Sequence, residues 1–492
     1  MAVVQCAAEL VNGDWTGRRV AVLAGGGNNG GDGLAVARLL YRRGAAVAVL
    51  LAGDPSRITG DAFTNLEAVR SLEIPVISVD DSEQMKDVLD NAQLYIDALL
   101  GVGARGAPRG AILELIDEAA RRPIPVVAID VPSGVDPDTG ETPGRALRAT
   151  LTVACGCAKP GLAITPGSLM AGKVVIADIG IGIHSHTETP FHWITPHYVR
   201  SVLPQWYMDD HKGRHGHLLV IGGSAGMSGA PALALRAALR SGAGLCSAVV
   251  PGVIRDAVAI QAPEAMVSGL ASAEPWLDGS VVHGDALSRC SAVAMGPGLG
   301  TSPACKGALA AVFKNRVPAM VLDADALNLM SADRSLKPVN PEQCVLTPHP
   351  GEAARMLDIT ASEVQAHRLT TARVLAVRTG CVVVLKGAGT LVAAPDGRVL
   401  ISSSGNPGMA TGGAGDVLTG CIGALLAAGM APFDAAACGA FLHGLAGDIA
   451  SIDHGLDGLT AGGIVDALPK AFLAVRQGTA PVKWSSWPMD HV

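Results

Sequence analysis

Two glycine-rich segments lie far apart in the chain, and each carries an aspartate just before or within a helix-like stretch. One is GNPGMATGGAGD at residues 405–416, which runs into the apolar stretch VLTGCIGALLAAG. Successive glycines let backbone N–H groups converge on one concavity, and a helix N-terminus adds partial positive charge, so this segment predicts an anion site. A carboxylate at Asp416 would then serve to remove a proton from a hydroxyl that attacks a bound phosphate. The alternative is an aspartate that only caps a glycine-rich turn.

The other segment is GGGNNGGDG at residues 25–33, which follows the apolar run VAVLA. Its position is that of a nucleotide-binding turn, but the glycines are not in GxGxxG register, which disfavours a plain NAD-dependent dehydrogenase. Its asparagines and aspartate, with Asp97, Asp130 and Ser133 near later strand ends, offer oxygen ligands for a hard cation. The alternative is a set of aspartate-containing turns that cap helices.

Short apolar runs, each ending in Gly, Asp or Ser, alternate with helix-like stretches around both segments. Six such runs lie between residues 18 and 180, and a second series begins with HLLVIGG at 217 and ends with CVVVLKGAG at 389. Continuous Val, Ile and Leu runs are typical of parallel strands that are buried on both faces. We therefore predict two α/β domains, with the reactive residues at the carboxyl ends of the strands.

The pattern also predicts where the domains begin and end. We expect a first domain over residues 1–190, a linker over 191–206 where no period is visible, a second domain over 207–480 and a frayed tail over 481–492. The segment 417–447 is the most apolar long stretch, but Pro432 and Asp434 interrupt it, so we expect two buried helices instead of a membrane span.

Composition restricts the class of protein further. The chain has 492 residues, a net charge of −7 and 16% charged residues, which argues against binding to nucleic acid or to an anionic membrane. Ten cysteines without a paired CxxC set indicate no zinc site and favour a reducing compartment. We expect a cytoplasmic protein without a signal peptide.

The second half resembles the ADP- or ATP-dependent NAD(P)H-hydrate dehydratase family, whose fold is ribokinase-like. Six segments carry the resemblance in order: KGRHGHLLVIGGSAGMSGAPALALRAALRSGAGL, MGPGLG, VLDADALN, LTPHPGE, VLKGAGTLVA and GNPGMATGGAGD. No Gly-Lys-Ser/Thr follows the last of them, so a P-loop is excluded. The resemblance implies that a nucleotide phosphorylates the C6 hydroxyl of a hydrated nicotinamide and that phosphate then leaves.

This resemblance also implies roles for individual residues. Asp416 would be the base, ADP would be the phosphate donor, and Mg²⁺ would accompany the ADP. We expect Asp323 and Asp325 to cap the following helix or support the site, although they could bind a metal. The hydrate would contact Ala230, Gly298, His349 and Asp416; the nucleotide and its phosphates would contact Lys386, Gly387, Ala388, Gly389, Thr390, Asn406, Gly412, Gly413, Ala414 and Gly415.

The first half resembles the NAD(P)H-hydrate epimerase domain, through GGGNNGGDG, YIDALLGVGARG and IDVPSGVD. The resemblance implies a Rossmann-like doubly wound fold and a potassium ion held by Asn29, Asp97 and Ser133. Asp130 would be the leading acid or base. The hydrate would contact Asn28, Asn29, Gly30, Gly31, Asp32, Gly101, Val102, Gly103, Ala104, Arg105, Gly106, Ala107 and Asp130.

The two resemblances together predict one enzyme that epimerises R and S NAD(P)HX and dehydrates the S form. We expect a homo-oligomer. The epimerase family usually carries a helical segment before the first strand, and only about 17 residues precede that strand here, so we expect this segment to be short or missing. One alternative is a ribokinase-like vitamin kinase fused to a nucleotide-binding domain. Another is a first domain that serves only as a binding or dimerisation module.

Overall fold

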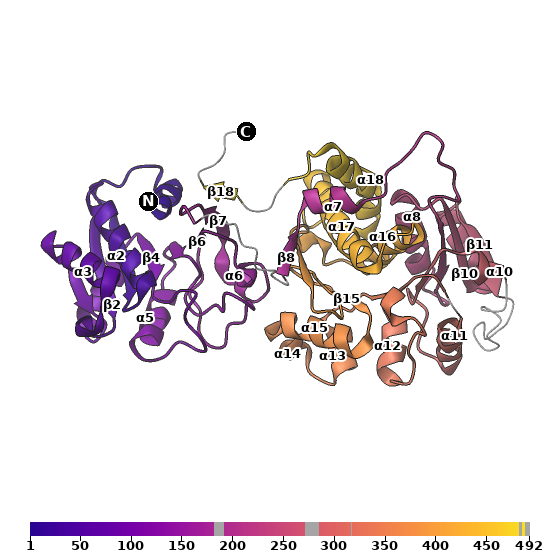
Figure 1. Cartoon of the computed structure of the whole chain (residues 1–492), viewed down its shortest axis with the longest axis horizontal. Helices are drawn as coiled ribbons and strands as arrows, with labels where there is room; N and C mark the ends of the chain where they lie inside the picture. Colours follow the sequence, from indigo (N-terminus) through magenta and orange to yellow (C-terminus); the bar gives the residue numbers. More distant parts are fainter. Residues whose placement is uncertain (182–190, 271–284, 316, 482–484, 488–492) are drawn as a thin grey trace. The chain divides into compact units, whose positions relative to one another are not determined.

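The chain forms two compact units, each around its own β-sheet (Figure 1). The computed structural model describes residues 1–181, 191–270, 285–315, 317–481 and 485–487. The first unit comprises Met1–Glu188 with Trp484–Val492, and the second comprises Thr189–Lys483. Both are α/β folds with predominantly parallel strands, as the two series of apolar runs predict.

The first unit contains an eight-stranded sheet of order β18-β7-β6-β5-β4-β1-β2-β3, whose strand pairs are all parallel. From β1 the chain builds outward through β2 to β3 and then returns to β4 on the other side. The carboxyl ends of β1 and β4 therefore flank the point where a doubly wound sheet binds ligands. The strands are β1 (Arg19–Gly25), β2 (Ala46–Ala52), β3 (Val76–Ser78), β4 (Leu94–Ala98), β5 (Val126–Ile129), β6 (Leu151–Cys155), β7 (Lys173–Ala177) and β18 (Ser485–Trp487).

Helices cover this sheet on both faces, which explains why its strands are apolar without alternation. In β1, Val20 and Val22 belong to the core beneath the first helices, whereas Ala21 and Leu23 belong to the core beneath α4 and α5. The helices are α1 (Ala2–Ala7), α2 (Asn28–Tyr41), α3 (Gly60–Ser71), α4 (Ser82–Asn91), α5 (Gly110–Ala120) and α6 (Gly167–Ala171), with 3₁₀ turns η1 (Ala8–Val11), η2 (Pro55–Arg57) and η3 (Pro160–Leu162).

The second unit contains a ten-stranded sheet of order β11-β10-β9-β12-β13-β14-β15-β16-β17-β8. Strand β16 runs antiparallel to both of its neighbours, and the other pairs are parallel. The strands are β8 (Phe191–Ile194), β9 (His217–Ile221), β10 (Leu245–Pro251), β11 (Met266–Leu270), β12 (Ala292–Met295), β13 (Met320–Leu322), β14 (Cys344–Leu346), β15 (Val382–Leu385), β16 (Leu391–Ala393) and β17 (Val399–Ser402).

One face of this sheet shares a large core with α8, α16, α17 and α18, and α16 packs directly on α8. Helices α12 to α15 lie on the opposite side of the sheet (Figure 1). The helices are α7 (Pro196–Val202), α8 (Gly229–Arg240), α9 (Arg255–Gln261), α10 (Asp285–Arg289), α11 (Pro303–Lys314), α12 (Asp325–Ala332), α13 (Pro350–Leu357), α14 (Ala361–Ala366), α15 (Arg368–Thr379), α16 (Ala414–Ala427), α17 (Pro432–His454) and α18 (Ala461–Gln477), with 3₁₀ turns η4 (Gly252–Ile254), η6 (Pro341–Gln343) and η7 (Pro407–Met409).

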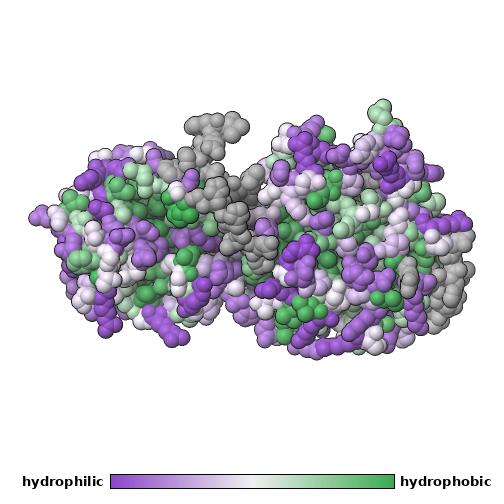
Figure 2. Space-filling view, viewed as in Figure 1, coloured by the Kyte–Doolittle hydropathy of each residue, from purple (hydrophilic) through white to green (hydrophobic). Residues whose placement is uncertain are grey.

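The apolar stretch 417–447 falls in α16 and α17, so the prediction of two buried helices is confirmed. Helix α17 is long and apolar enough to cross a membrane by composition, with a mean hydropathy of 1.3. However, 78% of that window is buried inside the protein, as in a core helix. On the face drawn in Figure 2, hydrophilic residues surround separate hydrophobic patches.

The expected linker and tail differ from the structure. Residues 191–206 contain β8 and α7, and β8 pairs with β17 through Phe191 and Val399, so this segment is part of the second sheet. Strand β18 in the expected tail pairs with β7 of the first sheet. Both pairings join segments far apart in sequence, which local periodicity does not encode. Residues 182–190, at the end of the predicted first domain, and residues 482–484 and 488–492 of the predicted tail lie outside the described residues.

Candidate active sites

In the second unit, the glycine-rich turn ends at the first turn of α16, where Asp416 is the third helical residue. Gly413 precedes the helix with φ +87°, a left-handed conformation that suits glycine. The first turn of a helix leaves amide N–H groups without carbonyl partners. A Cβ atom at Gly415 would lie 3.3 Å from Lys386 Nζ, so the missing side chain lets the lysine approach the turn.

Lys386 follows β15 and forms an ion pair with Asp323, which follows β13. The distance from Lys386 Nζ to Asp323 Oδ1 is 2.6 Å, and the Asp323 residue is 1% exposed. Thr419 on α16 donates its hydroxyl proton to the other oxygen, Asp323 Oδ2, over 2.8 Å. Residues from two other elements, the end of β15 and α16, thus hold this buried carboxylate, and its charge has a cationic partner, as a buried charge requires. The carboxylate oxygens of Asp323 bond Lys386 and Thr419 and do not cap α12, whose N-cap residue Ala324 makes no side-chain capping bond.

His349 and Glu352 form a reciprocal cap at the start of α13. Glu352 Oε2 accepts from the backbone N–H of His349 over 2.7 Å, and His349 Nδ1 accepts from the N–H groups of Gly351 and Glu352. Glu352 Oε2 also lies 3.8 Å from Lys386 Nζ. Burial lowers the pKa of His349, and Lys386 and Arg355 lower it further, so the ring is neutral and can accept these bonds.

The electrostatic balance at Asp416 is unusual for a carboxylate. Burial and the negative charge of Asp323 raise its pKa to about 7, and the positive charge of Lys386 opposes the shift. Burial disfavours the charged form of Lys386, but Asp323 and Glu352 outweigh it and raise the lysine pKa. A carboxyl group with a pKa near neutrality can accept a proton from an alcohol and release it again at physiological pH.

The structure also places two other groups of expected residues, the pair Ala230 and Gly298 and the loop 386–390. A Cβ atom at Gly298, where φ is +62°, would lie 3.2 Å from Ala230 Cβ, so these two positions adjoin. Buried Arg368 donates to the carbonyl oxygens of Leu385 and Lys386, which fixes the start of the loop 386–390. Thr390 Oγ1 donates to the Gly387 carbonyl within that loop.

Asn406 is engaged differently. Its Nδ2 donates to Asp448 Oδ1 over 2.9 Å, and its Oδ1 accepts from the N–H of Gly408. These contacts tie the start of the segment 405–416 to α17. They support its shape, but none of them joins Asn406 to the Asp416 cluster.

In the first unit, the expected cation ligands form one connected network. Ser133 donates to Asp97 through its hydroxyl over 2.5 Å and through its backbone N–H over 2.8 Å. The Ser133 hydroxyl oxygen accepts from the N–H of Leu100, and Asn29 Nδ2 donates to the Leu100 carbonyl over 2.8 Å. Asn29 after β1, Asp97 in β4 and Ser133 after β5 therefore lie in one hydrogen-bonded network.

Asp97 is fully buried, and burial raises its pKa to about 6 against the hydrogen bonds from Ser133. Among the ion pairs of the described residues, none involves Asp97. A buried carboxylate without a cationic side chain, surrounded by hydroxyl, amide and carbonyl oxygens, fits a weakly charged hard cation such as K⁺. Across the described ranges, no group of three or more His, Cys, Asp or Glu side chains could hold a metal ion.

Asp130 follows β5 in a left-handed conformation with φ +70°, which is strained for a residue with a side chain. Its Oδ1 accepts from the N–H of Cys155 over 3.0 Å and forms an ion pair with Lys159. Lys159 also donates to the Cys155 carbonyl over 2.7 Å. Although Asp32 is exposed, the pKa of its carboxyl group is raised by partial burial and by the nearby charge of Asp130.

The loop 101–107 follows β4 and reaches the same edge of the sheet. A Cβ atom at Gly101 would lie 3.1 Å from Asn29 Cβ, so this end of the loop contacts the glycine-rich turn. Further along, Arg105 forms an ion pair with Asp138 over 3.0 Å and donates to the Val102 carbonyl. Val102, Gly103, Arg105 and Gly106 are exposed.

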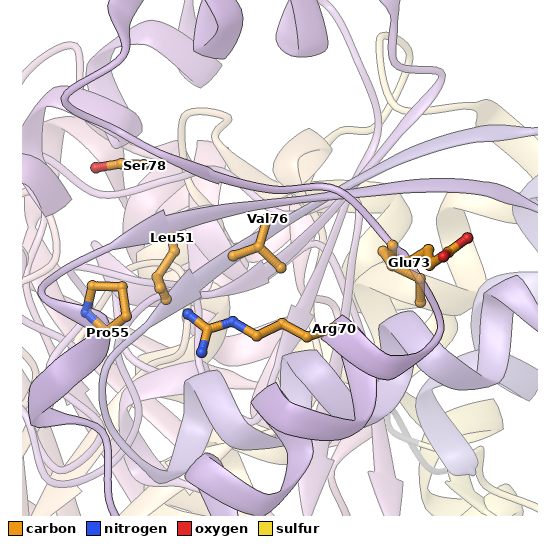
Figure 3. A pocket seen from close by; sticks show the side chains of 7 residues that line it. Leu51, Pro55, Arg70, Glu73, Val76 and Ser78 are labelled. Carbon is orange, nitrogen blue, oxygen red and sulfur yellow. The ribbon is translucent and has the colours of Figure 1, made fainter.

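Cavities elsewhere in the first unit do not contain these residues. A cavity of about 350 Å³ lies beside β2, β3 and the end of α3, and Figure 3 shows the Arg70 side chain running beneath Leu51 and Val76. Arg70 is paired with Glu67 over 2.9 Å. This cavity carries none of the carboxylates or glycine turns of the two sites.

Three residues of the clusters were not predicted from the sequence. Lys159 follows the fifth of the six predicted strand runs of the first half, so the strand-end argument could have found it. Glu352 stands three residues after His349, the spacing of a capping box. Thr419 carries no such signal, because a threonine inside an apolar helix is unremarkable until the fold brings Asp323 beside it.

The fold of the second unit is that of the ribokinase-like superfamily. It is similar to a ribokinase-like superfamily protein from Enterococcus faecalis, with a TM-score of 0.52 and 26% identity over 59% of this chain and 98% of that one. It is also similar to the ADP/ATP-dependent NAD(P)H-hydrate dehydratase from Bacillus subtilis co-crystallised with ATP and Mg²⁺. That match has a TM-score of 0.52 and 31% identity over 57% of this chain and 98% of that one.

Sequence comparison extends the assignment to the whole chain. Residues 218–470 match the NAD(P)H-hydrate dehydratase family, and residues 1–161 match the family described as YjeF-related protein N-terminus. The bifunctional NAD(P)H-hydrate repair enzyme Nnr of Moorella thermoacetica is 40% identical over 95% of this chain and 90% of its own length. The Escherichia coli enzyme of the same name is 37% identical, over 92% and 85% respectively. The chain therefore belongs to the bifunctional NAD(P)H-hydrate repair enzymes, which favours the repair function over a vitamin kinase.

Proposed function

We propose that the two units act in sequence on hydrated NAD(P)H, and that the charge cluster at the start of α16 carries out the dehydration. In this scheme the first unit interconverts R and S NAD(P)HX, and the second converts the S form to NAD(P)H with ADP. The observation that carries the scheme is Asp416, a carboxyl group with a pKa of about 7 beside a glycine-rich turn.

In the second unit, the Asp416 carboxylate accepts the proton of the C6 hydroxyl as its oxygen attacks the β-phosphorus of ADP. AMP leaves, and C6 then carries a phosphate ester. In the elimination, C5 loses a proton, the C5–H electrons form the C5–C6 double bond, and the C6–O electrons leave with phosphate. Lys386, within 2.6 Å of Asp323, supplies positive charge next to Gly415 and the phosphate turn.

The remaining expected residues of this unit bind the two ligands. Gly412 to Gly415 hold the transferring phosphate through backbone N–H groups, and the loop 386–390 binds the adenine nucleotide. Ala230, Gly298 and His349 contact the hydrate, while Asn406 supports the turn. Mg²⁺ fits as a companion of the nucleotide phosphates, where it neutralises charge, because the described residues offer no protein-only cage.

In the first unit, Asp130 is the acid–base residue, and Asn29, Asp97 and Ser133 hold K⁺. The bound cation would compensate the buried Asp97 carboxylate and stiffen the turn at 28–32 and the loop 101–107, which bind the hydrate. The pKa of about 6 for Asp97 in the absence of a cation supports this assignment. We further propose a cytoplasmic homo-oligomer that binds neither nucleic acid nor membrane.

The test is a mixture of R and S NADHX with ADP, Mg²⁺ and K⁺, followed at the absorbance of reduced nicotinamide. We expect a fast phase for the S fraction and a slower phase for the R fraction, both faster than without protein. Omission of ADP should remove both phases. Release of a stable phosphorylated product without NADH would support the vitamin-kinase alternative, and a slow phase equal to spontaneous epimerisation would refute the epimerase assignment.

Replacement of K⁺ by Na⁺ tests the cation separately. The slow phase should fall by about tenfold while the fast phase changes little, because the cation is assigned to the first unit only. Equal slow phases in the two salts would contradict the potassium site. A matched fall in both phases would indicate that the cation acts on the second unit.

A further inference from the structure

Asp130 and Lys159 form an ion pair that offers both a proton acceptor and a proton donor, whereas Asp130 alone offers only the acceptor. Both side chains are largely buried, with 14% of Asp130 and 11% of Lys159 exposed. They follow β5 and β6, at the carboxyl edge of the sheet where the glycine-rich turn also lies. The pair therefore combines a proton acceptor and a proton donor at the expected substrate side of the sheet.

The contacts of the pair leave one position free on each partner. In the part of the chain that the structure describes, both contacts of the Asp130 carboxylate go to Oδ1, from the Cys155 N–H and from Lys159. The second oxygen, Oδ2, remains to accept a substrate proton. An ammonium group has three donors, and Lys159 uses one on Asp130 and one on the Cys155 carbonyl. Its third proton remains for a ligand.

The backbone holds this arrangement in a strained form. Asp130 has φ +70°. Its backbone N–H donates to the Val153 carbonyl of β6 over 2.9 Å, and its carboxylate accepts from the backbone N–H of Cys155, also in β6. Two hydrogen bonds to β6 thus fix a conformation that costs energy in isolation. Strain of this kind persists where surrounding structure determines it, and it occurs at functional sites.

We propose that Lys159 is the general acid of the epimerase and works as a pair with Asp130. This inference rests on the proposed epimerase function. C6 of the hydrate carries both the hydroxyl group and the ring nitrogen N1, so it is a hemiaminal carbon. Its configuration can be inverted by opening and closing the ring, which needs a base at the hydroxyl and an acid at the nitrogen.

In the opening step, the Asp130 carboxylate accepts the hydroxyl proton, the O–H electrons form a C=O bond at C6, and the C6–N1 bond breaks. The C6–N1 electrons remain on N1, which receives a proton from Lys159. Rotation about the C5–C6 bond turns the other face of the carbonyl toward N1. Closure then reverses the transfers: N1 returns its proton to Lys159 and attacks C6, and the alkoxide takes the proton back from Asp130. No oxidant or other reactant is consumed.

The simpler role for Lys159 is to neutralise a buried carboxylate, and substitutions separate the two roles. Lys159→Met removes both the charge and the donor proton, whereas Lys159→Arg keeps the charge and the hydrogen bonds. A guanidinium does not give up its proton in proteins, so arginine restores the ion pair but not the acid. Lys173→Met is a matched control, because Lys173 pairs with Glu9 over 2.7 Å at the amino end of β7 in the same unit.

The experiment uses the full chain with R and S NADHX, ADP, Mg²⁺ and K⁺, and follows the two phases of NADH recovery. With Lys159→Met and with Lys159→Arg, we expect the slow phase to fall by about 10²-fold, toward the spontaneous rate. The fast phase, which the second unit produces, should remain within about twofold, and calorimetry of the first unit reports whether the substituted unit is folded. Lys173→Met should leave both phases unchanged.

The outcomes distinguish the inference from the function on which it rests. A Lys159→Arg variant whose slow phase is within about threefold of the wild type would overturn the acid role, since charge alone would then suffice. An unchanged slow phase in Lys159→Met would overturn any role of the lysine in the reaction. A wild-type chain without an accelerated slow phase would overturn the epimerase function itself, and this inference with it.

Discussion

The two units surround a similar aspartate with opposite charge balances. Asp416 is largely buried and lies near Asp323 and Asp325, and burial together with these negative charges raises its pKa to about 7, because the one lysine of its cluster is already paired with Asp323. Asp130 has its own lysine, in direct contact with its carboxylate. A glycine-rich turn at the carboxyl edge of a parallel sheet therefore does not determine the chemistry. With the roles proposed above, the charges around each aspartate would make Asp416 a lone base and Asp130 half of an acid–base pair.

The largest effect should come from removing each aspartate in turn. Asp416→Asn should lower NADH recovery from both epimers by about 10³-fold, because every repaired molecule passes through the second unit. Asp130→Asn should slow only the R fraction. The measurement is the biphasic absorbance trace of an R and S mixture, and chromatography should still detect epimer exchange in Asp416→Asn. Loss of the S fraction in Asp130→Asn would contradict separate sites.

A second test removes Lys386, which forms an ion pair with Asp323 and lies next to the glycine-rich turn before Asp416. Lys386→Met should lower the rate constant of S-NADHX repair by about 10²-fold, because positive charge next to the phosphate turn is lost. Lys386→Arg should recover part of the rate, since the charge matters here more than the proton. This response differs from the one expected at Lys159. Lys470→Met, which breaks an exposed pair with Asp453, is the control.

Loss of Lys386 also leaves the buried carboxylates of Asp323 and Glu352 without a cation, so stability must be followed in parallel. Calorimetry of the second unit reports whether the variant is folded, because epimer exchange reports only on the first unit. Equal activity of Lys386→Met and the wild type would mean that the cluster is structural and that the phosphate charge is neutralised elsewhere.

The pH dependence should also separate the units. The pKa of Asp416 is raised to about 7, and the base must be ionised to accept a proton. The kcat/KM of S-NADHX repair should therefore fall about tenfold per pH unit below pH 7. The rate of R-to-S exchange should not follow this limb. Rates measured between pH 5.5 and 8.5, corrected for the reaction without protein, check this, and a flat profile above pH 5 would place the base elsewhere.

Much of this arrangement could be predicted from the sequence. The long apolar runs became the central strands, because burial on both faces leaves an unmistakable composition. The strands that were not predicted are β3, β8, β11, β16, β17 and β18. Of these, β3, β8 and β11 lie at sheet edges and are only partly buried, so they lack the continuous apolar run of a central strand. The site aspartates follow from strand ends and glycine turns. Lys159 and Thr419 become partners only when the sheet order brings β6 beside β5 and α16 beside β13.

Replacing the two aspartates by asparagine should change the melting temperatures of their units in opposite directions. The folded-state pKa of Asp416 lies above the ordinary value, so the native state binds more protons than the unfolded state between about pH 4 and pH 7. The stabilisation at low pH is lost as pH rises through 7, and the charged group then opposes folding. Asp416→Asn should therefore raise the Tm of the second unit by about 2–4 °C at pH 8, and this gain should be clearly smaller at pH 5, because the penalty builds up between about pH 4 and pH 7.

Asp130→Asn should instead lower the Tm of the first unit, because Lys159 would remain buried without its carboxylate. Calorimetry of the nucleotide-free chain at pH 5 and pH 8 measures both shifts, and Asp466→Asn, which removes an exposed carboxylate of the second unit, is the control. A lower Tm for Asp416→Asn at pH 8 would mean that Lys386 compensates Asp416 as fully as Lys159 compensates Asp130. The two sites would then share one electrostatic design, and the difference in their chemistry would have to come from the ligands alone.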